Sequence, residues 1–142
     1  MAITQAMCDS FKRELLQGIH RFNAADGHDF KVALYSSAAN LGAATTVYTT
    51  SGEISGAGYA AGGKSLSRVD PTAAGGTAYT DFADISWDGA SFTARAALIY
   101  NASDGNRAVA VLDFGADKTV SSGTFTIQFP AADPASAIIR IG

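Results

Sequence analysis

The chain alternates apolar side chains with other side chains over many short segments, and this period of two restricts it to a mainly β fold. The clearest segment is "ASFTARAALIYN", residues 90–101. Its two faces consist of Phe92, Ala94, Ala96, Leu98 and Tyr100 on one side and Thr93, Arg95, Ala97 and Ile99 on the other. Because successive side chains of a strand point to opposite faces, this pattern predicts a strand that packs on a core.

Further segments of the same kind predict about seven short strands in all. They are "DFKVALYSS", residues 46–49, "KSLSRVDP" up to Pro71, residues 78–83, the mostly apolar "RAVAVLDFG", "TFTIQFP" after a turn at "SSG", and "ASAIIRI". Turn-forming residues separate them. Short strands at such spacing predict a compact antiparallel β-sandwich or jelly roll.

The N-terminal segment has a different period and predicts one amphipathic α-helix. Its apolar residues recur every three or four positions at Ile3, Met7, Phe11, Leu15, Ile19 and Phe22. This spacing lines one face of a helix over about residues 4–22. The helix would have to bury its stripe on the sandwich or on another subunit. We therefore expect a single domain over residues 1–142, with the helix first and the sandwich over about residues 29–141.

Composition excludes several classes of partner. Charged residues make up 16% of the 142 residues, and the net charge of −3 gives no attraction to nucleic acid or to an anionic membrane. No apolar run approaches the roughly 20 residues of a membrane helix, and no signal peptide is apparent, so we expect synthesis in a cytoplasm. Cys8 is the single cysteine, for which we expect a buried, inert thiol.

The glycine loop, residues 53–66 with the sequence "EISGAGYAAGGKSL", invites a search for a phosphate site. The stretch "GYAAGGKS", residues 58–65, formally matches a Walker loop. However, such a loop lies between a buried strand and a helix, and here a β-like run follows. We therefore interpret the glycines as positions of positive φ or of close approach, with Tyr59 burying its ring to fix the loop.

No residues form a recognisable catalytic, cofactor or metal site. His20 and His28 are the two histidines, and their spacing fits no zinc motif. Asp81 and Asp84 lie near Asp88, but an EF-hand pattern is absent and a solvated turn is the favoured interpretation. We therefore predict a non-enzymatic protein without cofactors.

Two charges stand in the most apolar strands. Arg95 and Asp113 would each be costly to bury alone, so we expect an ion pair. Pairing across neighbouring strands and pairing between subunits remain equally open. Among the aromatic residues, Trp87 and Phe82 are expected in the core.

Six segments taken in order carry a family resemblance. They are "MAITQAMCDSFKRELLQGIHRF", "FKVALYSS", "GEISGAGYAAGG", "ARAALIYN", "AVAVLDFG" and "FTIQFP". This succession covers nearly the whole chain and resembles small virion structural proteins of tailed bacteriophages. The resemblance implies a capsid decoration or cement protein that binds the major capsid protein on the outer surface of the virion. It also implies a homo-oligomer, with a trimer favoured.

The resemblance assigns no individual functional residue, so the candidate assembly surfaces come from amphipathicity and loop composition. They are Met7, Phe11 and Leu15 on the helix, and Glu53, Gly56, Gly58, Tyr59, Gly62 and Gly63 in the glycine loop. We expect bulky replacements of Gly58 and Gly62 to weaken capsid binding and to leave the fold intact.

Two rival functions remain open. A tail, baseplate or fibre-associated binding module fits the same low charge, and copy number in the virion separates it from a shell protein. An enzyme or nucleotide binder rests on the match at residues 58–65 alone.

Overall fold

The structure is a computed structural model that describes residues 2–142. These residues form two antiparallel β-sheets and one short α-helix near the N-terminus. The mainly β, sandwich-like fold with an N-terminal helix, predicted from the alternating pattern, is therefore confirmed.

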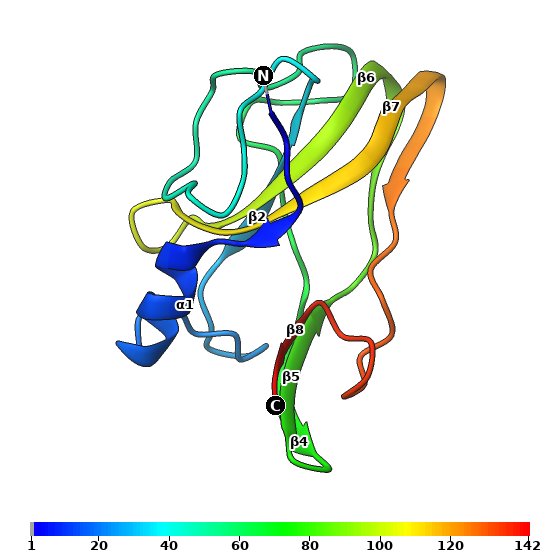
Figure 1. Ribbon diagram of the computed structural model, residues 1–142. Coiled ribbons are helices and arrows are strands. Elements are labelled where there is room, and N and C mark those ends of the chain that lie inside the picture. Colours follow the sequence, from blue (N-terminus) through cyan, green and yellow to red (C-terminus); the bar gives the residue numbers. More distant parts are fainter. Residues whose placement is uncertain (1) are drawn as a thin grey trace.

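The larger sheet has the strand order β1-β7-β6-β2-β3 and is built on two long strands. β6 (Ile85–Asn101) and β7 (Arg107–Ile127) pair antiparallel and form a ribbon across the molecule (Figure 1). β2 (Phe30–Tyr35) pairs with β6 and carries β3 (Lys64–Ser65) on its other edge, while β1 (Ala6–Met7) lies on the free side of β7.

β7 merges two of the predicted strands. The expected turn at "SSG" is instead an irregularity within the strand, where Ser122 has a φ of 48° and the pairing register shifts. A positive φ at one residue lets the strand bend without ending. The strand predicted at residues 46–49 is reduced to a single bridge between Val47 and Arg107.

The smaller sheet has the order β4-β5-β8 and projects from one end of the ribbon (Figure 1). It consists of β4 (Arg68–Ala74), β5 (Thr77–Phe82) and β8 (Ile139–Ile141). The prediction that Pro71 ends its strand is wrong, because β4 continues through it. The register of the β4–β5 pair shifts between Val69 and Thr72, and β4 is an edge strand, so the missing N–H of Pro71 breaks no regular ladder.

The helix α1 (Asp9–Leu16) is shorter than the predicted residues 4–22. Ala6 and Met7 pair with β7, and Gly18 adopts a φ of 71° just beyond the helix. Ile3 and Met7 are four positions apart, a spacing that suits a period of two as well as a helix. This ambiguity explains the overestimate at the N-terminal end.

The core extends from α1 along the ribbon. Phe11 packs on Phe22, and Phe22 stacks on Phe30 with ring centroids 4.3 Å apart. Farther along, Trp87 and Phe92 pack against Phe125, and Trp87 and Phe82 are buried as expected. The thiol of Cys8 is fully buried, and burial raises its pKa to about 11. It is therefore protonated at neutral pH, as expected of an inert thiol.

Candidate functional site

The carboxylate of Glu53 organises the glycine loop. Its Oε1 accepts a hydrogen bond from the Tyr48 hydroxyl at 2.5 Å. Its Oε2 accepts one from the Tyr59 hydroxyl and one from the Gly62 amide at 2.8 Å. Tyr100 closes the far side by donating to the Gly62 carbonyl at 2.6 Å. The loop is therefore fixed to its own sheet by a half-buried charge.

The tyrosines around Glu53 have raised pKa values for the same reason. Burial, followed by the hydrogen bond to Glu53, raises the pKa of Tyr48 and Tyr59 well above the usual range. Burial, with a smaller effect of the Glu53 charge, raises the pKa of Tyr100 to about 12. All three phenols keep their protons at neutral pH and act as hydrogen-bond donors.

The glycines of this loop allow close contact with the sheet. A Cβ at Gly63 would lie 1.8 Å from the Val32 carbonyl oxygen, and one at Gly58 would lie 2.9 Å from Ala90 Cα. Both glycines also have φ near 80°, in the left-handed region. The expectation that a bulky replacement at Gly58 leaves the fold intact is therefore wrong, because the added atoms would meet backbone.

The formal Walker match does not form a phosphate cradle. The amide of Gly62 already donates to Glu53, and that of Gly63 donates to the Ala60 carbonyl. Lys64 lies in β3, where its Nζ donates to the Ser86 carbonyl and lies 5.7 Å from the Trp87 ring centroid. The amides and the cation that would bind phosphate are thus engaged within the chain.

The candidate assembly residues of the N-terminal segment occupy different environments. Phe11 is fully buried in its own chain, so it cannot contact a partner without unfolding. Met7 belongs to β1, and Leu15 is half-buried beside the smaller sheet. Leu16, the last residue of α1, is 92% exposed.

Arg95 and Asp113 pair across β6 and β7. Arg95 Nε donates to Asp113 Oδ1 at 3.1 Å. The same carboxylate oxygen accepts the Gly115 amide, and residues 114–117 of β7 stand opposite Arg95 alone. The hydrogen bond from Gly115, followed by that from Arg95, lowers the pKa of Asp113. The pair therefore stabilises the base of an irregular four-residue bulge in β7.

This bulge borders the aromatic groove, a depression of 440 Å³ beside β7. Its apolar lining consists of Leu112, Phe114, Phe125, Ile127, Phe129, Pro130 and Ile138. Phe114 belongs to the bulge and Phe125 lies farther along β7, and their ring centroids are 6.0 Å apart. β1 pairs with β7 only as far as Val111, and beyond it the Gln5 side chain accepts the Asp113 amide. Within residues 2–142, no strand of the same chain therefore covers the groove. Sequence reasoning did not identify it, because its residues lie on separate segments.

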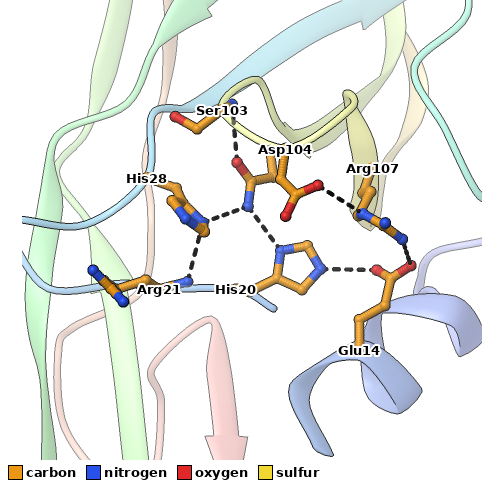
Figure 2. Close-up of polar contacts among 8 residues, drawn as sticks. Glu14, His20, Arg21, His28, Ser103, Asp104 and Arg107 are labelled. Atoms are coloured by element: carbon orange, nitrogen blue, oxygen red, sulfur yellow. Dashed lines mark hydrogen bonds and ion pairs between the residues drawn. The ribbon is translucent and has the colours of Figure 1, made fainter. Parts of the chain in front are cut away.

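A polar cluster joins α1 to the turn between β6 and β7 (Figure 2). Its members are Glu14, His20, Arg21, His28, Asn101, Ser103, Asp104 and Arg107. Glu14 Oε1 lies 2.8 Å from His20 Nε2, and Glu14 Oε2 accepts from Arg107 Nη1 at 2.9 Å. Glu14, His20 and Asn101 are all buried.

The charges in this cluster have identifiable physical consequences. Burial raises the pKa of Glu14, but the hydrogen bonds from His20 and Arg107 outweigh it, so the pKa is lowered overall. Burial lowers the pKa of His20 against the opposing effect of Glu14, so the imidazole is neutral at neutral pH. Both histidines were singled out from the sequence, but Glu14 was not. The available signal was the position of Glu14 next to the apolar face of the helix, where a buried carboxylate needs a partner.

The sequence predicts neither a catalytic site nor a metal site, and the structure can be searched for metal-binding groups and membrane-spanning helices. In the part of the chain that the structure describes, no three His, Cys, Asp or Glu side chains are grouped to hold a metal ion. Over residues 2–142, no helix has the length and hydrophobicity needed to cross a bilayer.

Comparisons with known proteins add no assignment to this geometry. No protein-family model, no curated protein and no solved structure matches the chain.

Proposed function

We propose that this chain is a capsid decoration protein, which binds the major capsid protein on the outer shell of a tailed bacteriophage and stabilises it without chemistry. Two observations support the proposal. The first is the resemblance of six ordered segments to small virion structural proteins. The second, which carries the structural argument, is an uncovered aromatic groove on a rigid β scaffold.

The segments that carry the resemblance come together in the structure as one scaffold. β2, β6 and β7 are adjacent strands, and the glycine loop contacts β2 through Tyr59 and β6 through Tyr100. Glu53, Gly58 and Gly63 serve this packing. The distinctive residues thus encode a stiff support, which suits a protein whose function depends on shape.

The groove has the character of a protein-contact surface. Aromatic and aliphatic side chains line it, and the charge of Asp113 at its edge is already paired with Arg95. The lining also includes the exposed Lys118, whose long side chain can keep its charge in water at the rim while an apolar partner contacts the aromatic centre. Apolar depressions with aromatic anchors are typical centres of protein interfaces. We accordingly place the capsid contact at Phe114, Phe125 and Phe129.

A homo-oligomer belongs to the same proposal, with a trimer favoured for placement at three-fold axes of the shell. Light scattering of the purified protein measures this directly. A trimeric mass supports that placement, and a strictly monomeric protein at high concentration contradicts it.

A binding experiment tests the groove. Particles of the encoding phage that lack this protein are mixed with purified protein and pelleted. Wild type should bind in saturable fashion, and Phe114→Ser should bind at least about tenfold more weakly. Val47→Ser is the matched control, because Val47 is 46% exposed and lies outside the groove. Absence of wild-type binding, or equal binding by a Phe114→Ser protein with normal thermal unfolding, overturns the proposal.

A further inference from the structure

The side-chain amide of Asn101 connects two imidazoles. Its Nδ2 lies 3.0 Å from His20 Nδ1 and 2.8 Å from His28 Nδ1. Its Oδ1 accepts the Ser103 amide at 3.0 Å, which fixes the orientation of the group. Both N–H bonds of Asn101 therefore point at histidine nitrogens, and both nitrogens have to accept.

This arrangement exists only when both histidines are neutral. A protonated Nδ1 carries its own N–H and has no lone pair to offer to Asn101. His20 has no alternative site for a proton, because its Nε2 already faces Glu14 at 2.8 Å and donates to that carboxylate. His28 Nδ1 is committed as well, since it also accepts the backbone amide of Arg21 at 3.3 Å. Protonation of either Nδ1 therefore places two donors against each other.

Charged residues surround these imidazoles on every neighbouring element, and Glu14 and Arg107 are the ones whose charges act on His20. The surrounding charged residues are Glu14 from α1, Arg21 and Asp29 from the segment before β2, Arg68 from β4, Asp104 from the β6–β7 turn and Arg107 from β7. Glu14 favours the imidazolium form of His20, whereas burial disfavours it and prevails, which lowers the pKa of His20. Protonation is therefore delayed to acidic pH and, when it occurs, opposes the folded geometry.

The segment held by this network has few other buried anchors. Residues 17–28 are largely exposed, with His20 and Phe22 as the buried exceptions. Exposed polar contacts attach it to β4, because Arg68 donates to the carbonyl groups of Asn23, Ala24 and His28 and the Ala24 amide donates to Asp70 at 2.6 Å. Ile19 donates its amide to the Glu14 carbonyl. A segment with so few buried contacts opens at a lower free energy than the sheet beneath it.

We propose that Asn101, His20 and His28 form an acid-sensitive latch, which holds residues 17–28 on the β6–β7 turn at neutral pH and releases them when an imidazole is protonated. Release breaks the two Asn101–histidine hydrogen bonds and uncovers Phe22, while β6 and β7 stay paired. The latch is independent of the proposed role in the virion.

Hydrogen exchange of the full-length protein measures the latch, at about pH 7.5 and about pH 5 with correction for the intrinsic pH dependence. Exchange within residues 17–28 should accelerate by at least about tenfold at the lower pH, the factor for one unit of differential protonation. Amides of β2 and of the paired parts of β6 and β7 should not change. Unchanged protection of residues 17–28, or an equal loss over the whole chain, overturns the proposal.

Two variants and one spectrum isolate the cause. Asn101→Asp keeps the shape and offers acceptors to both Nδ1 atoms, so residues 17–28 should become better protected at about pH 5 than at about pH 7.5. His28→Asn keeps an acceptor without a titrating group, so the acid response should shrink. If Asn101→Asp does not fold, His28→Asn decides together with ¹⁵N spectra of the wild type, which should show both histidines as Nε2–H tautomers. A wild-type acid response in either folded variant, or an Nδ1–H tautomer at neutral pH, contradicts the latch.

Discussion

The Tyr59 hydroxyl donates to one Glu53 carboxylate oxygen and at the same time accepts the amide of Leu34 at 3.0 Å. This contact links the glycine loop to β2 from within the loop. A phenol that both donates and accepts satisfies a backbone amide that no neighbouring strand reaches. The Glu53–Tyr59 pair is thus the main attachment of the glycine loop to β2.

Replacement of Glu53 by Gln should destabilise the fold. The amide keeps the size of the carboxylate but removes its charge and turns an N–H toward groups that are already donors. We expect a loss of about 2 kcal/mol in the free energy of unfolding, as for hydrogen bonds to charged groups. Urea denaturation measures it, with Asp88→Asn as the control, because Asp88 is an exposed carboxylate that accepts from Thr124. Equal stabilities of the two variants would contradict the role of Glu53.

A pair of glycine variants separates steric contact from backbone strain. Gly63 and Gly75 both have positive φ, but a Cβ at Gly75 meets nothing within 4 Å. Gly75→Ala should cost about 1 to 2 kcal/mol from the left-handed conformation alone. Gly63→Ala should cost more than about 3 kcal/mol, because it adds a collision with the Val32 carbonyl. Thermal or chemical unfolding checks the difference, and similar costs would refute the close approach.

The carboxyl group of Asp113 should titrate below the ordinary value of about 3.9. Its contribution to stability is present above that value and is lost as the pH falls through the lower pKa of the folded state. NMR titration of Arg95→Met should show recovery of less than half of the shift, because the Gly115 amide is the larger cause. A full return to the ordinary pKa would show that Arg95 alone sets it.

Removal of the Glu14 charge should weaken the attachment of α1. The Glu14 side chain is 3% exposed and accepts hydrogen bonds from His20 and Arg107. Glu14→Gln should lower the free energy of unfolding by about 2 kcal/mol, because Arg107 can turn to solvent while the buried imidazole cannot. Asp9→Asn, at a side chain 74% exposed, should change it by less than about 0.5 kcal/mol. Indistinguishable unfolding curves for these two proteins would contradict a structural role for Glu14.

The sequence allowed the strands to be predicted better than their ends and junctions. The alternation at Phe92–Tyr100 identified β6, because the two-residue period of a strand is a local property that does not depend on which strand it pairs with. The extent of α1 was overestimated, since residues spaced by four satisfy both periods and Met7 was free to join β7. The pairing of β1 with β7 is a long-range contact that no local pattern encodes.

The candidate sites were less predictable for the same reason. The close approach of the glycines was correctly interpreted from their number, but the partner atoms at Val32 and Ala90 belong to distant strands. The aromatic groove depends on the bulge at residues 114–117. The sequence of these residues contains no pattern that predicts a bulge. Asn101 likewise lies near His28 because β6 pairs with β2 so that Asn101 stands opposite Phe30. No local pattern predicts that register.

Copy number per particle is the most direct measurement of the proposed role. Quantitative mass spectrometry of purified virions compares this chain with the major capsid protein. A decoration protein repeats with the shell, so the account predicts a copy number on the order of hundreds per particle, as expected for a subunit placed by capsid symmetry. A few copies or a few dozen would assign the chain to the tail, and its absence from mature virions would contradict a structural role altogether.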